Sequence, residues 1–140
     1  MKKKLLIIAL ACMILCFTAC SARLPYDLEG TDSIEIHAYG NESAEPVAEF
    51  VVKGEDAERI VEMFSALKLK EMKYTEPSIN GYEFWFMDEN GSNIAKIELP
   101  YGPSPWVVVG GTAYQDINGG VDVVYLTQLV DIASTASPME

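Results

Sequence analysis

The sequence predicts an α+β domain, in which an antiparallel sheet of about six strands carries two helices packed on one face. Two observations lead to this prediction. Short segments that alternate between apolar and polar residues indicate half-buried strands, and two longer segments have apolar residues at helical spacing. The predicted order is strand, strand, helix, four strands, helix. Helices on one face would bury the apolar side of the strands and leave the other side of the sheet exposed.

The first two predicted strands run from Ser33 to Tyr39 and from about Val47 to Lys53, with a turn over Asn41–Pro46 between them. In the first strand the apolar positions Ile34, Ile36 and Ala38 alternate with Glu35, His37 and Tyr39. In the second, Ala48, Phe50 and Val52 point inward, and Val47, Glu49 and Val51 point outward. Each strand is therefore expected to have one buried side and one open side.

A helix is predicted after Gly54, which ends the second strand. Glu55 and Asp56 fall in its first turn, where carboxylates suit the positive end of the helix dipole. Lys68 and Lys70 lie near its negative end. The apolar residues form one stripe that should face the sheet: Ala57, Ile60, Val61, Phe64 and Leu67.

The strongest hairpin signal lies between Tyr82–Met87 and Asn93–Leu99. These two predicted strands flank a short connection that contains Asn90-Gly91, and this pair readily adopts the positive φ that a tight turn needs. Facing carboxylates, such as Glu83 with Glu98, would arise in this hairpin, and an acidic chain brings carboxylates together by chance.

The last predicted elements are a short strand pair and a helix. Trp106–Val109 and Thr112–Tyr114 flank Gly110-Gly111, which marks a turn. The helix spans Val121–Ile132, and its expected buried side consists of Val121, Val124, Tyr125, Leu129 and Ile132.

The N-terminal segment has the charge and hydropathy pattern of an export signal. Lys2, Lys3 and Lys4 precede the apolar run Leu5–Phe17, which is shorter than the roughly 20 residues of a membrane-spanning helix. The following Phe17-Thr18-Ala19-Cys20 resembles the lipobox of bacterial lipoproteins. That resemblance implies that residues 1–19 are a signal peptide and that Cys20 receives a lipid anchor that includes palmitate, on the extracytoplasmic face of the cell membrane. The alternative is an ordinary thiol in a signal cleaved nearby or in a retained anchor.

This reading divides the chain into an acylated Cys20 with a tether over residues 20–31, one domain over residues 32–133 and a flexible tail over residues 134–140. The whole chain has a net charge of −11, and removal of the three leader lysines leaves 7 basic against 21 acidic residues, a net charge of −14. Such a charge argues against nucleic acid and against broad adhesion to anionic lipid. The mature part would keep one cysteine and no disulfide.

Three features give the region Ser33–Ile132 a family resemblance. They are the helix start at Gly54-Glu55-Asp56, the hairpin with Asn90-Gly91, and the Gly110-Gly111-Thr112-Ala113-Tyr114 step before the last helix. Together they resemble the YhfM-like domain of small lipoproteins in Firmicutes. The resemblance implies a membrane-anchored protein of Gram-positive bacteria and provides no catalytic residue.

No enzymatic motif, cofactor site or metal site is predicted. The chain has neither a Gly-x-Ser-x-Gly elbow nor a phosphate-binding loop, so no catalytic residue is expected. His37 is the single histidine, and with Glu35 it provides two potential ligands where a structural zinc ion needs four. A metal site completed by Glu49 or Glu98 stays an alternative to a solvated histidine.

The predicted function is that of a non-catalytic binding module for an extracytoplasmic protein, peptide or cell-wall ligand. The candidate partner-binding residues lie on the open side of the sheet or beside the proline-rich loop Pro100–Pro105: His37, Tyr39, Trp85, Met87, Tyr101 and Trp106. A one-residue slip would exchange the faces and expose Tyr82, Phe84 and Phe86 instead. The alternative function is an accessory or inhibitory lipoprotein whose acidic surface enters a basic site of an exported enzyme.

Overall fold

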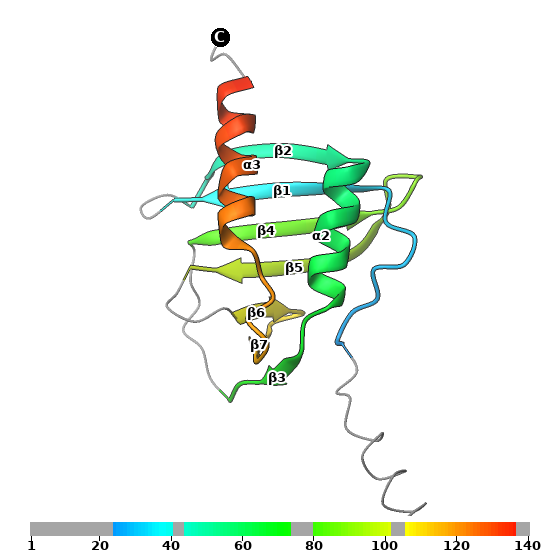
Figure 1. The fold of residues 1–140 in the computed structure, drawn as a ribbon, viewed down its shortest axis with the longest axis vertical. Coiled ribbons are helices and arrows are strands. Elements are labelled where there is room, and N and C mark those ends of the chain that lie inside the picture. The colour runs from blue at the N-terminus through cyan, green and yellow to red at the C-terminus, as the bar shows by residue number, and fades with distance from the viewer. Residues whose placement is uncertain (1–23, 41–43, 74–79, 102–105, 137–140) are drawn as a thin grey trace, which may run out of the picture.

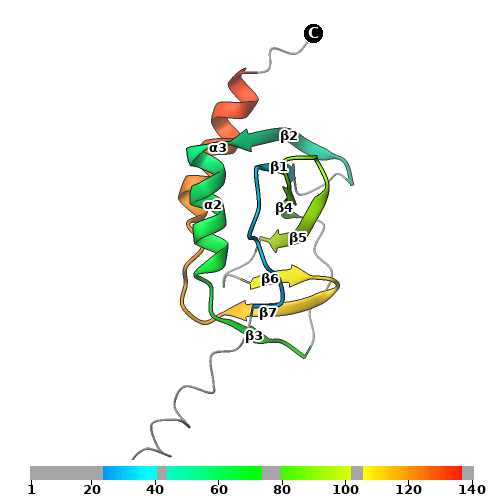
Figure 2. The same cartoon turned by 90° about the vertical axis from the view of Figure 1, so that its right-hand side faces the viewer.

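The computed structural model describes residues 24–40, 44–73, 80–101 and 106–136. They form one antiparallel sheet of seven strands, and two helices cover one of its faces (Figures 1 and 2). The predicted α+β class and the placement of both helices on the same face are therefore confirmed. The sheet has one strand more than expected. The predicted signal peptide and Cys20 lie outside the described residues.

The strands follow each other across the sheet in the order β2-β1-β4-β5-β6-β7-β3. Their bounds are β1 Ser33–Tyr39, β2 Pro46–Lys53, β3 Leu69–Glu71, β4 Gly81–Met87, β5 Asn93–Pro100, β6 Trp106–Val109 and β7 Thr112–Asp116. The helices are α2 Glu55–Ser65 and α3 Val123–Ala136. Strand β1 lies between β2 and β4 and pairs with both of them.

The core lies between the helices and the inner face of the sheet. The predicted alternation has the right phase, since Ile34 and Ile36 of β1 and Phe84 and Phe86 of β4 are buried. The Phe64 ring of α2 packs edge-on against both phenylalanine rings, with centroids 4.9 Å from Phe84 and 5.8 Å from Phe86. Edge-to-face pairs of this kind stabilise a core beyond the apolar area that they bury.

The predicted β4–β5 hairpin is also confirmed. Gly91 has a φ of 77°, which is the left-handed conformation that a turn with Asn-Gly requires. The Asp88 side chain closes the turn, because its Oδ1 accepts hydrogen bonds from the backbone N–H groups of Asn90 and Ser92.

The extra strand β3 was missed because only its pairing with β7 defines it. Helix α2 ends at Ser65, so the predicted position of Lys68 and Lys70 at the end of the helix is wrong, and Lys70 lies in β3. Ala66 is the C-cap of the helix, and its backbone N–H donates to Glu62 O. A three-residue strand shows no periodicity of its own, so the sequence pattern could not reveal it.

The face predicted for α3 needs correction. Val124 and Ile132 are 69% and 64% exposed, whereas Leu126, which was not predicted, is buried. The helix begins two residues later than predicted. Oδ1 of Asp122 accepts the N–H of Tyr125 and caps the helix, so Val121 precedes it. The Tyr125 hydroxyl then donates to Asp56 of α2 at 2.7 Å, and burial followed by this carboxylate raises the pKa of Tyr125 to about 12.

The domain extends further at both ends than predicted. The described part of the predicted tether, residues 24–31, packs on the domain: Leu28 is buried, and the Tyr26 hydroxyl donates to Phe64 O at 2.8 Å. Apolar Leu28 and the aromatic ring of Tyr26 favour this packing over solvent. At the other end α3 continues to Ala136, so the first residues of the predicted tail are helical.

Candidate functional site

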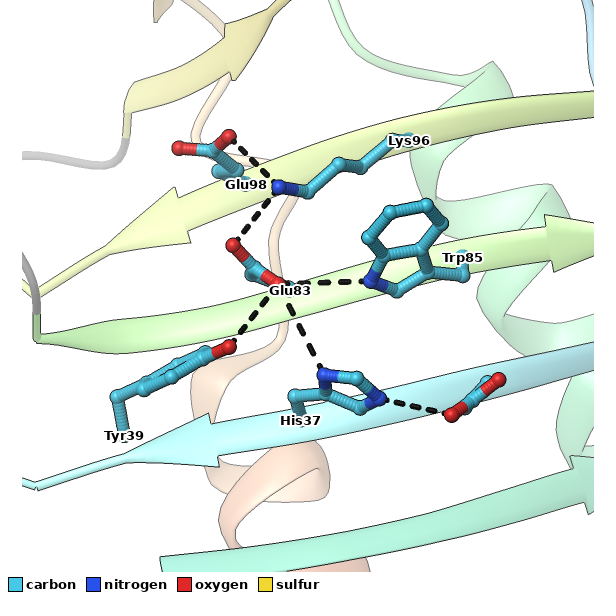
Figure 3. A network of polar contacts seen from close by, with 7 residues as sticks. His37, Tyr39, Glu83, Trp85, Lys96 and Glu98 are labelled. Carbon is cyan, nitrogen blue, oxygen red and sulfur yellow. Dashed lines mark hydrogen bonds and ion pairs between the residues drawn. The ribbon is translucent and has the colours of Figure 1, made fainter. Parts of the chain in front are cut away.

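The candidate site lies on the outer face of the sheet, which the helices leave uncovered (Figure 2). Polar and aromatic side chains from three neighbouring strands meet there (Figure 3). We call this group the Glu83 cluster; it consists of Glu35, His37 and Tyr39 from β1, Glu83 and Trp85 from β4, and Lys96 and Glu98 from β5. Strand alternation places all seven opposite the buried residues of the same strands.

The carboxylate of Glu83 is the centre of the cluster. Its Oε1 lies 2.8 Å from Nζ of Lys96. Its Oε2 accepts hydrogen bonds from the Tyr39 hydroxyl at 3.1 Å and from Nε1 of Trp85 at 3.4 Å, and lies 3.8 Å from Nδ1 of His37. Both oxygens are therefore engaged, and one carboxylate orients three aromatic side chains.

These contacts keep Glu83 ionised. Partial burial by itself would raise the pKa of this carboxyl group. Hydrogen bonds from Lys96, Tyr39 and Trp85, together with the positive charge of Lys96, outweigh burial and hold the pKa below its usual value. Glu83 in turn contributes, after burial, to a raised pKa of the Tyr39 hydroxyl, so Tyr39 stays a neutral donor.

Lys96 joins the two glutamates of the hairpin. Its Nζ lies 2.8 Å from Glu83 and 3.2 Å from Glu98, and 5.0 Å from the centroid of the Trp85 ring. Burial alone would lower the pKa of Lys96, but its hydrogen bonds and charge interactions with the two carboxylates raise it. One ammonium group thus fixes two carboxylates and packs against an indole ring, which are strong constraints on its position.

A cavity of about 300 Å³ opens beside the cluster, where β4 begins and β5 ends. Its lining includes Tyr39, Ala44, Gly81, Glu83, Glu98 and Pro100. Gly81 brings the two strands close together: with a φ of 140° it occupies a conformation that side chains rarely adopt, and a Cβ there would overlap the Leu99 carbonyl oxygen. The cavity therefore shares Tyr39 and both hairpin glutamates with the cluster.

The structure brings three of the predicted binding residues together and separates the others. His37, Tyr39 and Trp85 all belong to the cluster. Met87 lies at the far end of β4, paired with Ser33. Trp106 lies on the outer face of β6, because the next residue is buried, but it is outside both the cluster and the cavity lining.

Tyr101 directly follows β5 and is 47% exposed, but it is not among the described residues that line the cavity. Its ring packs edge-on against the buried Tyr82, with centroids 5.4 Å apart. This contact places the ring on the same side as Leu99, two residues earlier, and part of its surface stays exposed. Residues 102–105 of the proline-rich loop lie outside the described residues.

The sequence suggested the facing of Glu83 and Glu98 but not the role of Lys96. The register of β4 and β5 pairs Glu83 with Glu98 and Trp85 with Lys96. The available signal was the hairpin turn, since its length sets which residues face each other across the strands. The ammonium group of Lys96 lies between the two carboxylates and contacts both of them.

Two kinds of feature are absent from the described residues, a metal-ligand group and a membrane-spanning helix. In this part of the chain, no group of three or more histidine, cysteine, aspartate or glutamate side chains is arranged to hold a metal ion. No helix among the same residues has the length and apolar character that crossing a membrane requires.

Comparisons of the chain with family models, with curated proteins and with solved structures find no match. They neither support nor contradict the resemblance to a lipobox or to the YhfM-like domain. Both resemblances stay predictions.

Proposed function

We propose that this protein is a lipid-anchored, extracytoplasmic binding module without catalytic activity, and that the outer sheet face at the Glu83 cluster holds its partner. The observation that supports this proposal is the arrangement of Tyr39, Trp85 and His37 around one ionised carboxylate, beside a cavity and on the uncovered face. The large apolar side chains of the core, such as Phe84 and Phe86, lie on the other side of the sheet, so the cluster is not part of their packing.

Preorganisation is the physical reason that this surface suits binding. Ordering a mobile side chain on association costs roughly 0.5–1.5 kcal/mol, and the hydrogen bonds of Glu83 already restrict Tyr39 and Trp85. Tyrosine and tryptophan are also the residue types that dominate the binding energy of many interfaces. The two rings are half-buried, so each retains surface for a partner.

Attachment to the membrane is tested at Cys20. Labelling cells with a fatty-acid analogue is expected to mark the wild-type chain and not Cys20→Ser, because the lipid is attached to this residue. Cys16→Ser is the matched control and should label like the wild type. Equal labelling of Cys20→Ser would disprove the anchor and leave the binding surface to be tested separately.

The binding face is tested by site-specific photocrosslinking in cells. A photoreactive residue at Val51, which is 56% exposed and faces Glu35 on the outer side of the sheet, should yield a defined crosslinked species. The same residue at Ile132, exposed on α3 on the opposite side, is the control and should not. Equal products from both positions, or none from Val51, would contradict the proposal.

The identity of the crosslinked species also separates the two functional candidates. A structural protein, peptide or wall polymer would support the binding module. An exported enzyme whose activity changes when the module is added would support the accessory or inhibitory role instead.

A further inference from the structure

We propose that the occupant of the outer face is an extended basic peptide segment, and that the cavity beside the Glu83 cluster receives one of its lysine or arginine side chains. This inference rests on the proposed function and specifies the chemistry of the partner. It is drawn from the distribution of charge on the outer face and from the unequal engagement of the two glutamates that line the cavity.

Negative charge on the outer face is spread along a line across the strands and is not concentrated at one point. The strand registers place Glu49, His37, Glu83 and Glu98 side by side on β2, β1, β4 and β5, and we call these four residues the acidic row. Neighbouring strands lie about 4.8 Å apart, so the row extends for about 14 Å. An extended peptide covers this length with about four residues.

The positive charge next to the row is too small to balance it. Lys96 supplies one ammonium group, which contacts Glu83 and Glu98, whereas the row holds three carboxylates. Lys96 itself lies one row away, opposite Trp85. A surface with this excess repels acidic partners and attracts basic ones, and the net charge of −11 for the whole chain acts in the same direction.

Glu98 is the group best placed to hold a basic side chain. Glu83 uses both carboxylate oxygens within the cluster, but among the described residues Glu98 is engaged only through Oε1. Its side chain is 40% exposed and lines the cavity together with Tyr39. A carboxylate and an aromatic ring are the groups that bind an ammonium or guanidinium ion.

The size of the cavity favours one side chain over a larger ligand. Its volume of about 300 Å³ lies at the lower limit of ligand pockets in general. The rest of the peptide would lie over the acidic row, on the face that the helices leave uncovered. Cavity and row together therefore match a chain with basic residues better than a compact small molecule.

The test uses the full-length chain purified in a neutral detergent and an acetylated, amidated octapeptide of alternating arginine and serine. A second peptide with citrulline at every arginine position removes the charge and keeps the shape. Fluorescence anisotropy at low salt should show binding of the arginine peptide and at least tenfold weaker binding of the citrulline peptide. Equal binding of the two peptides would overturn the inference.

Two variants locate the binding site. Glu98→Gln should weaken binding of the arginine peptide about tenfold, because it removes the one partly free carboxylate of the cavity. Ala44→Trp should also weaken it, because a bulky side chain at this exposed lining position obstructs the cavity without changing any charge. Glu62→Gln, on the exposed side of α2, is the control for loss of one charge and should change affinity less than twofold.

The remaining outcomes separate this inference from the proposed function. If the arginine peptide binds wild type and Glu98→Gln equally, the cavity does not receive a basic side chain, and the inference fails. If agmatine, a free guanidinium compound, competes as well as the peptide does, the occupant is a small cation and the inference also fails. A partner crosslinked at Val51 without any binding of the arginine peptide refutes the inference alone, whereas loss of both results refutes the proposed function as well.

Discussion

The two faces of the sheet are built on opposite principles from the same strands. On the inner face of β4, Phe84 is fully buried against the Phe64 ring of α2. On the outer face the next residue, Trp85, is half-buried and is held by a hydrogen bond to Glu83 and by the ammonium group of Lys96. Apolar packing orders one face, and polar contacts order the other.

This difference indicates where the molecule can change without unfolding. The inner face contributes most of the stability, because burial of a large apolar side chain is worth roughly 1.5–3 kcal/mol. The outer face contributes less for each residue, because its charges stay partly hydrated. Substitutions on the outer face should therefore cost less stability than substitutions on the inner face, and the following variants test this contrast from its largest expected effect to its smallest.

The largest effect is expected for Phe84→Ala. Removal of the buried ring leaves a cavity against Phe64 and should lower the free energy of unfolding by about 3–5 kcal/mol. Denaturant-induced unfolding followed by circular dichroism measures this change. A loss below about 1 kcal/mol would mean that the helices do not pack on this face.

Trp85→Ala should destabilise the domain much less, although the side chain removed is larger. Loss of the hydrogen bond to Glu83 and of the contact with Lys96 is expected to lower the free energy of unfolding by about 1–2 kcal/mol. Trp85→Phe, which keeps an aromatic ring, serves as the control and should recover part of this loss. If Trp85→Ala were as damaging as Phe84→Ala, the outer face would be a second core.

Glu83→Gln should have a still smaller effect, which depends on pH. At neutral pH the variant should lose about 1 kcal/mol, because solvent screens the ion pair with Lys96. The pKa of Glu83 is lowered in the folded state, so its contribution is present above the unfolded value of about 4.3 and is lost as the pH falls through the folded value.

Unfolding of wild type and Glu83→Gln at a series of pH values checks this prediction. The stabilisation by Glu83 should be present at neutral pH and should shrink below about pH 4. Glu62→Gln, on α2, controls for the general effect of one acidic charge. A difference that does not shrink below about pH 4 would show that Glu83 is not stabilised as a carboxylate.

The smallest effect is expected at the edge of the outer face. Val51→Thr replaces an exposed residue of β2 by one of similar shape and should change the free energy of unfolding by less than about 0.5 kcal/mol. Thermal unfolding in parallel with wild type measures this change. A larger loss would show that the edge of the sheet is packed against something in solution.

Most of the secondary structure could be predicted because short-range patterns of apolar and polar residues indicate it. The alternation of Ile34, Ile36 and Ala38 and the helical stripe around Phe64 both reflect burial on one side of an element, and they gave the right faces. The prediction failed for segments whose structure depends on contacts with residues distant in the sequence. Strand β3 exists through pairing with β7, and residues 24–31 join the domain because Tyr26 and Leu28 find partners there.

The candidate site was predictable only in part. Strand alternation placed His37, Tyr39 and Trp85 on the outer face, but nothing in the pattern joined them to Lys96 or assigned Glu83 a central role. Tyr101 is exposed, but its ring packs against Tyr82, a contact that its proline-rich neighbours in the sequence did not reveal.

By itself, the sequence determined the fold class, the two amphipathic helices and the side of each long strand that is buried, because hydrophobic burial imposes a period on the chain. The tertiary structure decided which strands are neighbours and in which register, and hence that Glu83 meets His37 on one side and Glu98 on the other. Pairing between strands is a relation between distant residues, and no local period encodes it. The acidic row and the cavity are products of that pairing.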